Sequence, residues 1–220
     1  METNKYLQAG FYTDSDNPKV RKFAQKYYKP EDNDIQRAVK IYYGVRDGFL
    51  YNPYRLNLNQ SALKASHILD NQQSYCVEKA IVLTAAYRAA GLPARLGFAI
   101  VKNHIGTERL ERFLQTNLLV FHGYTEVYLN NRWVKATPAF NKALCDKLGV
   151  LPLEFDGKTD SVLQEYDRSG AQYMEYVHFY GTFHDLPYDL FISELKKHYP
   201  RLFESKYYDA ARQKMCFTEE

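Results

Sequence analysis

The 220-residue sequence has few cysteines and no pattern that would join them into a covalent or metal-binding framework. Its three cysteines, Cys76, Cys145 and Cys216, are widely separated, and no Cys-x-x-Cys pair occurs. An odd, scattered set argues against a disulfide framework and against a cysteine-rich zinc site. His178 and His184 have no carboxylate at a metal-ligand interval, so we predict no bound metal.

The sequence also lacks a long apolar run and a large excess of charge of one sign. The most apolar stretch, 80–101, is interrupted by Arg88 and Arg95, and residues 1–10 have no apolar core. We therefore expect neither a membrane span nor a signal peptide, and we expect the cytoplasm as the compartment. With 29 basic and 26 acidic residues, the formal net charge of +3 disfavours nucleic acid or an anionic membrane as the main partner.

Glycine-rich phosphate-binding loops are missing as well. The 11 glycines form neither a Gly-x-x-x-x-Gly-Lys-Ser/Thr loop nor a Gly-x-Gly-x-x-Gly fingerprint, so no cofactor is predicted. The chain is rich in apolar residues: 45% of its residues are hydrophobic, which suffices for a substantial core. No repeat or Pro/Gly/Ser linker divides it, and we expect a single domain over 1–220.

Helical periodicity dominates the first half of the chain. Asn17 followed by Pro18 is typical of a helix N-terminus, with the asparagine as N-cap and the proline in the first turn. The clearest helix is expected over 74–90, with Ser74 as N-cap and Gly91 as C-cap. The remaining predictions here are helices near 30–48, 62–69 and 189–199 and a loose stretch through residue 16.

Apolar and alternating segments in the second half predict strands. These cover 96–101, 118–129, 132–137 and 151–155, while 173–180 fits either a helix or a strand. Asn130-Asn131 joins two of them and is a two-residue hairpin turn. Because helices come first and antiparallel strands follow, the sequence favours an α+β fold over a doubly wound α/β fold.

Cys76 lies at the start of the predicted 74–90 helix. Unpaired N–H groups and the positive end of the helix dipole favour a thiolate there, and the Cys76 N–H is placed to face an oxyanion. Glu78 opposes this, because a nearby carboxylate disfavours a second negative charge. A lone cysteine in a helix is more often a buried, inert thiol.

His122 near the start of the 118–129 strand supplies the partner that a thiol nucleophile needs. An imidazole accepts the thiol proton and later protonates the leaving group. With Asn130-Asn131 as a two-residue loop, the register places Thr137 diagonal to His122 on the same face, at about 7–8 Å between backbones. That is the position from which a side chain would orient the imidazole.

The segment from Ser74 to Pro138 resembles a known family. The helix-initial cysteine, the tail Arg-Ala-Ala-Gly-Leu-Pro-Ala-Arg at 88–95, and His-x-x-x-Glu-Val-Tyr-Leu-x-x-x-Trp-Val from His122 are similar to the transglutaminase-like superfamily. The resemblance covers roughly 42–141. It implies a papain-like core in which the cysteine helix packs on an antiparallel sheet, with 142–220 as a C-terminal extension.

The same resemblance implies a triad of a cysteine, a histidine and usually an aspartate. Carried over by position, these are Cys76, His122 and the position that Thr137 occupies. Thr137 departs from the pattern, because its hydroxyl accepts a hydrogen bond from the ring N–H but lacks the negative charge of an aspartate. An uncharged residue can orient the imidazole, as asparagine does in papain-like enzymes. Asn141 is the alternative third member if the strand bends at Pro138.

A second oxyanion donor has four candidates: Gln72 and Gln73, just before the cysteine, and the hydroxyl of Tyr51 or Tyr54 on the preceding extended segment. The expected function is acyl transfer or hydrolysis through a Cys76 thioester, acting on a protein, a peptide or a small amide or ester. Both water and an amine fit as the acyl acceptor, and hydrolysis is slightly favoured. The alternative is a catalytically inactive binding or scaffolding module that keeps the fold.

Overall fold

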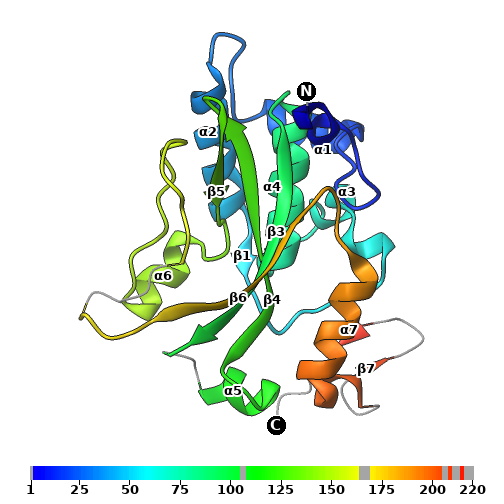
Figure 1. Cartoon of the computed structure of the whole chain (residues 1–220), viewed down its shortest axis with the longest axis vertical. Helices are drawn as coiled ribbons and strands as arrows, with labels where there is room; N and C mark the ends of the chain where they lie inside the picture. Colours follow the sequence, from blue (N-terminus) through cyan, green and yellow to red (C-terminus); the bar gives the residue numbers. More distant parts are fainter. Residues whose placement is uncertain (1, 105–107, 164–168, 205–207, 210–213, 216–220) are drawn as a thin grey trace.

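A four-stranded antiparallel sheet and one central helix organise the fold (Figure 1). This computed structural model describes residues 2–104, 108–163, 169–204, 208–209 and 214–215. The strand order is β5–β4–β3–β6, formed by β3 (Ala94–Asn103), β4 (Leu118–Leu129), β5 (Arg132–Ala136) and β6 (Met174–Phe183). Helix α4 (Cys76–Ala89) packs against β4 and β3. The predicted α+β fold, with the cysteine helix on an antiparallel sheet, is confirmed.

Shorter elements surround this centre. Two small sheets pair β1 (Leu50–Tyr51) with β2 (Gln73–Ser74) and β7 (Tyr208–Asp209) with β8 (Lys214–Met215). The other described helices are η1 (Glu2–Leu7), α1 (Pro18–Gln25), α2 (Asp34–Gly48), η2 (Ser61–Leu63), α3 (Ala65–Ile68), α5 (Glu108–Leu114), α6 (Lys142–Leu148), α7 (Tyr188–His198) and η3 (Pro200–Phe203). Within these described ranges, no helix is long and apolar enough to cross a membrane.

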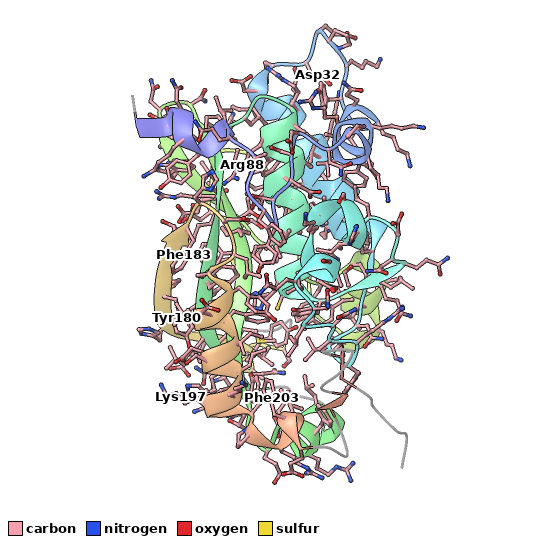
Figure 2. The ribbon with its side chains drawn as sticks, turned by 90° about the vertical axis from the view of Figure 1, so that its right-hand side faces the viewer. Asp32, Arg88, Tyr180, Phe183, Lys197 and Phe203 are labelled. Carbon is pink, nitrogen blue, oxygen red and sulfur yellow. The ribbon has the colours of Figure 1, made fainter. Side chains whose placement is uncertain are left out.

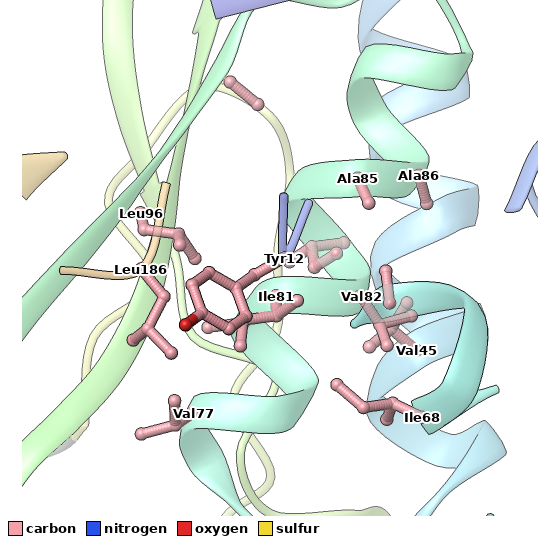
Figure 3. Close-up of a cluster of buried hydrophobic side chains, with 14 of the residues drawn as sticks. Tyr12, Val45, Ile68, Val77, Ile81, Val82, Ala85, Ala86, Leu96 and Leu186 are labelled. Atoms are coloured by element: carbon pink, nitrogen blue, oxygen red, sulfur yellow. The ribbon is translucent and has the colours of Figure 1, made fainter. Parts of the chain in front are cut away.

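Helix α4 is the core of the molecule and is apolar on nearly all sides. Every residue from Val77 to Arg88 is buried, which is typical of a helix enclosed by other elements. Figure 3 shows Ile81 and Val82 on α4 among side chains from other elements, including Val45 of α2 and Leu96 of β3. The helix ends at Ala89 with Ala90 as its C-cap, one residue before the predicted Gly91. Gly91 follows the cap with a φ of 79°, the left-handed conformation that favours glycine at this position.

The β4–β5 hairpin has the predicted register. Leu129 pairs with Arg132 and Glu126 pairs with Lys135. Asn130 and Asn131 both have positive φ, 48° and 63°, as a tight two-residue hairpin turn requires.

Some element boundaries differ from the predictions because capping chemistry decides them. Helix α2 begins at Asp34 rather than near residue 30, since Asn33 accepts a hydrogen bond from the Gln36 N–H and the Gln36 side chain accepts one from the Asn33 N–H, both at 2.9 Å. The predicted helix over 62–69 is two short pieces that meet at Lys64, whose ψ of 138° is extended.

Other predictions were wrong because long-range contacts override local sequence. The N-terminal stretch is ordered: η1 forms, Asp185 accepts the Tyr12 and Thr13 N–H groups at 2.9 and 3.0 Å, and Arg88 donates to the Gln8 carbonyl (Figure 2). The 151–155 segment has no strand ladder, and Arg46 donates to the Leu153 carbonyl instead. Of the two alternatives predicted for 173–180, the strand is found, because 174–180 belong to β6, whereas α5 and α6 were not predicted at all.

Candidate active site around Cys76 and His122

Cys76 is the first residue of α4, but its N-cap is Tyr75 and not Ser74. Ser74 lies in β2, where it pairs with Tyr51, so its backbone is already extended. The Glu78 carboxyl accepts the Tyr75 N–H at 3.2 Å and satisfies one of the donors at the helix N-terminus. The prediction of Ser74 as the cap was wrong, because the β1–β2 pairing places that residue outside the helix turn.

Gly123 allows α4 and β4 to approach closely beside the cysteine. A Cβ at this position would lie 2.9 Å from the Val77 Cα and 3.2 Å from the Cys76 carbonyl oxygen, so no larger residue fits without a backbone shift. Because Gly123 follows His122 directly, the first turn of the cysteine helix is packed against the histidine strand. This contact brings together two residues that are far apart in the sequence.

Cys76 and His122 line the same small cavity of about 60 Å³. Tyr51 of β1 and Tyr75 contribute to its walls as well. The opposite wall comes from α7 and the residue after it, through Phe191, Leu195 and Tyr199. Tyr199 is fixed there because its hydroxyl donates to the Leu118 carbonyl and accepts the Val120 N–H, both at 2.6 Å.

The His122 ring is buried without a hydrogen bond. The residue is only 1% exposed, and neither Nδ1 nor Nε2 has a partner among the described residues. Burial alone lowers the pKa of His122 to about 4, so the imidazole is neutral at pH 7. The two residues therefore share a cavity without a thiol–imidazole hydrogen bond in this state.

The Cys76 thiol is also neutral. Although the residue keeps part of its surface exposed, burial raises the pKa of its thiol to about 11. Hydrogen bonds from the Gly123 and Val77 N–H groups and from the Tyr51 hydroxyl act in the opposite direction but are outweighed. The thiolate expected from the helix N-terminus is therefore not the resting form. Burial also raises the pKa of Glu78 to about 8, so this carboxyl does not act as a full negative charge beside the sulfur.

Tyr51 lies between the thiol and Asn141. Its hydroxyl hydrogen-bonds to Cys76, and its backbone N–H donates to the Asn141 Oδ1 at 3.0 Å. Burial holds the pKa of the Tyr51 hydroxyl well above its usual range, so the group remains a proton donor. Asn141 thus positions Tyr51, and the described contacts do not connect it with the His122 ring.

Thr137 is fully buried, and its carbonyl accepts the Tyr42 hydroxyl at 3.1 Å. Thr137 Oγ1 makes no hydrogen bond of normal length and angle among the described residues, but it lies close enough to the Tyr176 hydroxyl to affect the pKa of that group. Buried polar atoms without partners are few in native proteins, and functional sites are one place where they occur. Here they gather near the cysteine: both His122 nitrogens, Thr137 Oγ1, Ser74 Oγ and the Tyr75 hydroxyl.

The two glutamines proposed as oxyanion donors do not line the Cys76 cavity. Gln72 is exposed, and its carbonyl accepts the Leu50 N–H at 3.0 Å. The Gln73 side chain accepts the Asn52 amide at 2.8 Å. Cys145 is buried in a separate apolar cluster, and Cys216 lies outside the described residues.

Sequence analysis missed Lys79, which is completely buried one turn after the cysteine. Its ammonium donates to three backbone carbonyls, those of Arg46, Phe49 and Ala139, at 2.7, 3.1 and 2.9 Å. Phe49 leads into β1 and Ala139 follows Thr137, so Lys79 ties the segments that carry Tyr51, Thr137 and Asn141 to α4. The available signal was a lysine inside the most apolar helix of the chain.

The sequence of the chain matches one family model. A model described as the transglutaminase-like superfamily matches residues 21–138, which is more than half of the chain. No curated protein matches significantly. Among the described residues, no group of three or more His, Cys, Asp or Glu side chains is arranged to hold a metal ion.

Two solved structures match this chain at low sequence identity and with TM-scores below 0.5. A putative cysteine protease from Cytophaga hutchinsonii is 17% identical with a TM-score of 0.48, and the match covers 83% of this chain and 54% of that one. A putative protease from Parabacteroides distasonis is 14% identical with a TM-score of 0.39, over 62% of this chain and 25% of that one. The chain thus spans about half the length of the first protein and a quarter of the second.

Proposed function

Because this chain belongs to the transglutaminase-like superfamily, we propose that it is a cysteine-nucleophile enzyme that transfers or hydrolyses acyl groups. One observation carries the proposal: Cys76 at the start of α4 and His122 on β4 line a single cavity. A thiol nucleophile requires this combination, because a base must take its proton and return it to the leaving group. The substrate is an amide or ester of a protein, a peptide or a small molecule.

The reaction begins from two neutral groups. As the Cys76 sulfur bonds to the acyl carbonyl carbon, its proton passes to a His122 ring nitrogen. The carbonyl electrons move to oxygen and form a tetrahedral oxyanion. When the oxyanion collapses, the bond to the leaving nitrogen or oxygen breaks, and His122 returns the proton to that atom. Water then attacks the thioester with His122 again acting as the base, which releases the acid and restores the thiol.

The raised thiol pKa favours this concerted route over a standing ion pair. A thiol with a pKa of about 11 and an imidazole with a pKa of about 4 do not exchange a proton spontaneously. A nucleophile of this kind is activated by an adjacent general base during attack. The ring nitrogens of His122 have no competing partner among the described residues, so they are available for the thiol proton.

The oxyanion has two donors in this proposal. The Cys76 N–H belongs to the first turn of α4, where N–H groups have no partner within the helix. The Tyr51 hydroxyl already donates to the sulfur and stays protonated, so it can donate to an oxygen that forms next to that sulfur. Thr137 is the proposed third member, as the hydroxyl predicted to lie diagonal to His122 on the same face of the sheet, and Asn141 contributes indirectly by holding Tyr51.

Hydrolysis of p-nitrophenyl acetate and incorporation of dansylcadaverine into casein test the proposal and separate water from an amine as acceptor. We expect Cys76→Ala to abolish both activities and to remove the acetylated Cys76 peptide from a quenched reaction. Cys145→Ala is the matched control, because that thiol is buried elsewhere, and it should keep the activity. Full turnover by Cys76→Ala would contradict the proposal.

A second candidate function is supported by the missing hydrogen bonds around the imidazole. A neutral threonine at the third position and an unpartnered His122 ring are also expected of a binding or scaffolding module that has lost catalysis. In that case no acyl-enzyme would form, and Cys76 would react with iodoacetamide no faster than Cys145. An acetylated Cys76 would exclude this alternative.

A further inference from the structure

A second, larger cleft lies next to the Cys76 cavity. Its volume is about 540 Å³, which is within the range of small-ligand sites. Tyr51, Pro53 and Leu119 line both spaces, so the two are contiguous. Because Tyr51 lines both spaces, a group bound in the cleft lies across Tyr51 from the cavity that holds Cys76.

The walls of this cleft are aromatic and aliphatic. Tyr51 meets Phe140 edge to face, with ring centroids 4.8 Å apart, and Tyr173 lies 6.4 Å from Phe140. Leu144 and Leu148 project from one face of α6, and Met174 completes the wall from β6. Rings arranged in this way favour an edge or face contact with another ring.

The charge of the cleft narrows the class of ligand further. The described residues that line it include Lys147 as their only charged side chain, and no carboxylate. Lys147 is exposed, and no ion pair of its ammonium is found in the described part of the chain. The wall also contains the uncharged polar residues Asn52 and Asn103, and its one charge is positive. This combination disfavours a lysine or arginine side chain and accepts an uncharged one.

We infer that this cleft receives a bulky aromatic side chain of the acyl donor, close to the carbonyl that Cys76 attacks. The inference rests on the proposed function and adds the substrate class to it. Six of the thirteen described residues that line the cleft, from Phe140 to Met174, lie beyond residue 138, outside the region that the family model matches. The C-terminal segments of this chain therefore contribute to the preference.

Peptidyl chloromethyl ketones test this, because the ketone replaces the substrate carbonyl and alkylates the nucleophile. The probes carry Phe, Ala or Lys at either of the two residues before the reactive carbon, and Cys76 alkylation in the full chain is followed by mass spectrometry. We expect the phenylalanine probe to react at least about tenfold faster than the alanine probe at one of these positions. The lysine probe should react no faster than the alanine probe.

Leu148→Arg introduces a large cation into the cleft wall and should bring the Phe/Ala rate ratio to about one. Leu151→Arg is the matched control, because Leu151 is 51% exposed and does not line the cleft, and it should keep the preference. Iodoacetamide, which needs no cleft, should alkylate Cys76 equally in both variants. Thermal unfolding by circular dichroism confirms that both remain folded.

The outcomes separate the two ideas. Equal rates for all three probes, with Cys76 alkylated in each case, would overturn the cleft assignment and leave the proposed function standing. No alkylation of Cys76 by any probe would overturn the proposed function. In that case, calorimetry of N-acetylphenylalaninamide binding to Cys76→Ala tests the cleft independently of catalysis. Binding that is lost in Cys76→Ala/Leu148→Arg would support the cleft as an aromatic ligand site. Absence of binding to Cys76→Ala would overturn the cleft assignment.

Discussion

Lys79 and His122 are buried to nearly the same degree, at 0% and 1% exposure, yet their hydrogen bonding is opposite. The Lys79 ammonium uses all three of its donors on backbone carbonyls, whereas neither nitrogen of His122 has a partner among the described residues. An unpaired buried polar group costs free energy, and a fully paired one supports the structure.

This difference distinguishes Lys79, which holds the segments around the site together, from His122, which can take part in the reaction. Lys79 connects α4 to the end of α2, to the entry of β1 and to the segment after Thr137, and it leaves no donor for another role. His122 contributes nothing comparable to stability, but its ring is free to take and return a proton. Substitutions of Lys79, His122 and Thr137, and a change of pH, test this contrast.

Replacing Lys79 with alanine should produce the largest effect. The change leaves three buried carbonyls without a donor and opens a cavity, so we expect the free energy of unfolding to fall by about 4 kcal/mol. Urea unfolding measures it, with Lys22→Ala on the exposed face of α1 as the control. A loss below about 1 kcal/mol would show that the lysine is not a structural node.

The His122→Phe variant should show the reverse pattern. It keeps a ring of similar shape and removes two unpartnered nitrogens, so the free energy of unfolding should stay equal or rise by about 1 kcal/mol. Turnover of p-nitrophenyl acetate should fall by about a hundredfold or more, because the general base is gone. A variant that is destabilised but fully active would reverse the roles assigned here.

Acid should destabilise the wild-type protein through His122. The folded chain holds this pKa at about 4, below its ordinary value of 6.5, so between these pH values the unfolded chain binds a proton that the folded chain does not. Stability is therefore complete above pH 6.5 and decreases by roughly 3 kcal/mol as the pH falls to 4. In His122→Phe this part of the loss should disappear. If the free energy of unfolding fell equally with pH in the two proteins, the contribution of His122 would be disproved.

Thr137→Val should have the smallest effect and tests the third member of the site. Since the hydroxyl makes no hydrogen bond of normal length and angle among the described residues, the free energy of unfolding should change by less than about 0.5 kcal/mol. Turnover should fall by about fivefold, the value of one neutral hydrogen bond to the imidazole. Unchanged turnover would remove Thr137 from the catalytic group, and Thr137→Ser, which keeps the hydroxyl, should retain activity.

Short-range sequence patterns predicted several features of the fold. The Asn17 cap and the Asn130-Asn131 turn depend on neighbouring residues, and both are as expected, while the left-handed Gly91 lies one residue beyond the C-cap of α4. Where the partners are distant in the sequence, prediction of the N-cap failed. Ser74 lies in a strand pair with β1 instead of capping α4.

Short-range sequence signals were enough to predict the α+β fold, the hairpin register, a helix that begins at Cys76 and a strand that begins near His122, because periodicity and turn chemistry act over a few residues. The family was predicted from the resemblance of the motifs between Ser74 and Pro138. The protonation of the two groups and the shape of the space beside them could not be predicted in this way, because both depend on tertiary contacts. Burial depends on every element that surrounds a side chain: α7 encloses the Cys76 cavity, and α6 with β6 forms much of the adjoining cleft. A thiol expected to be charged is neutral for that reason.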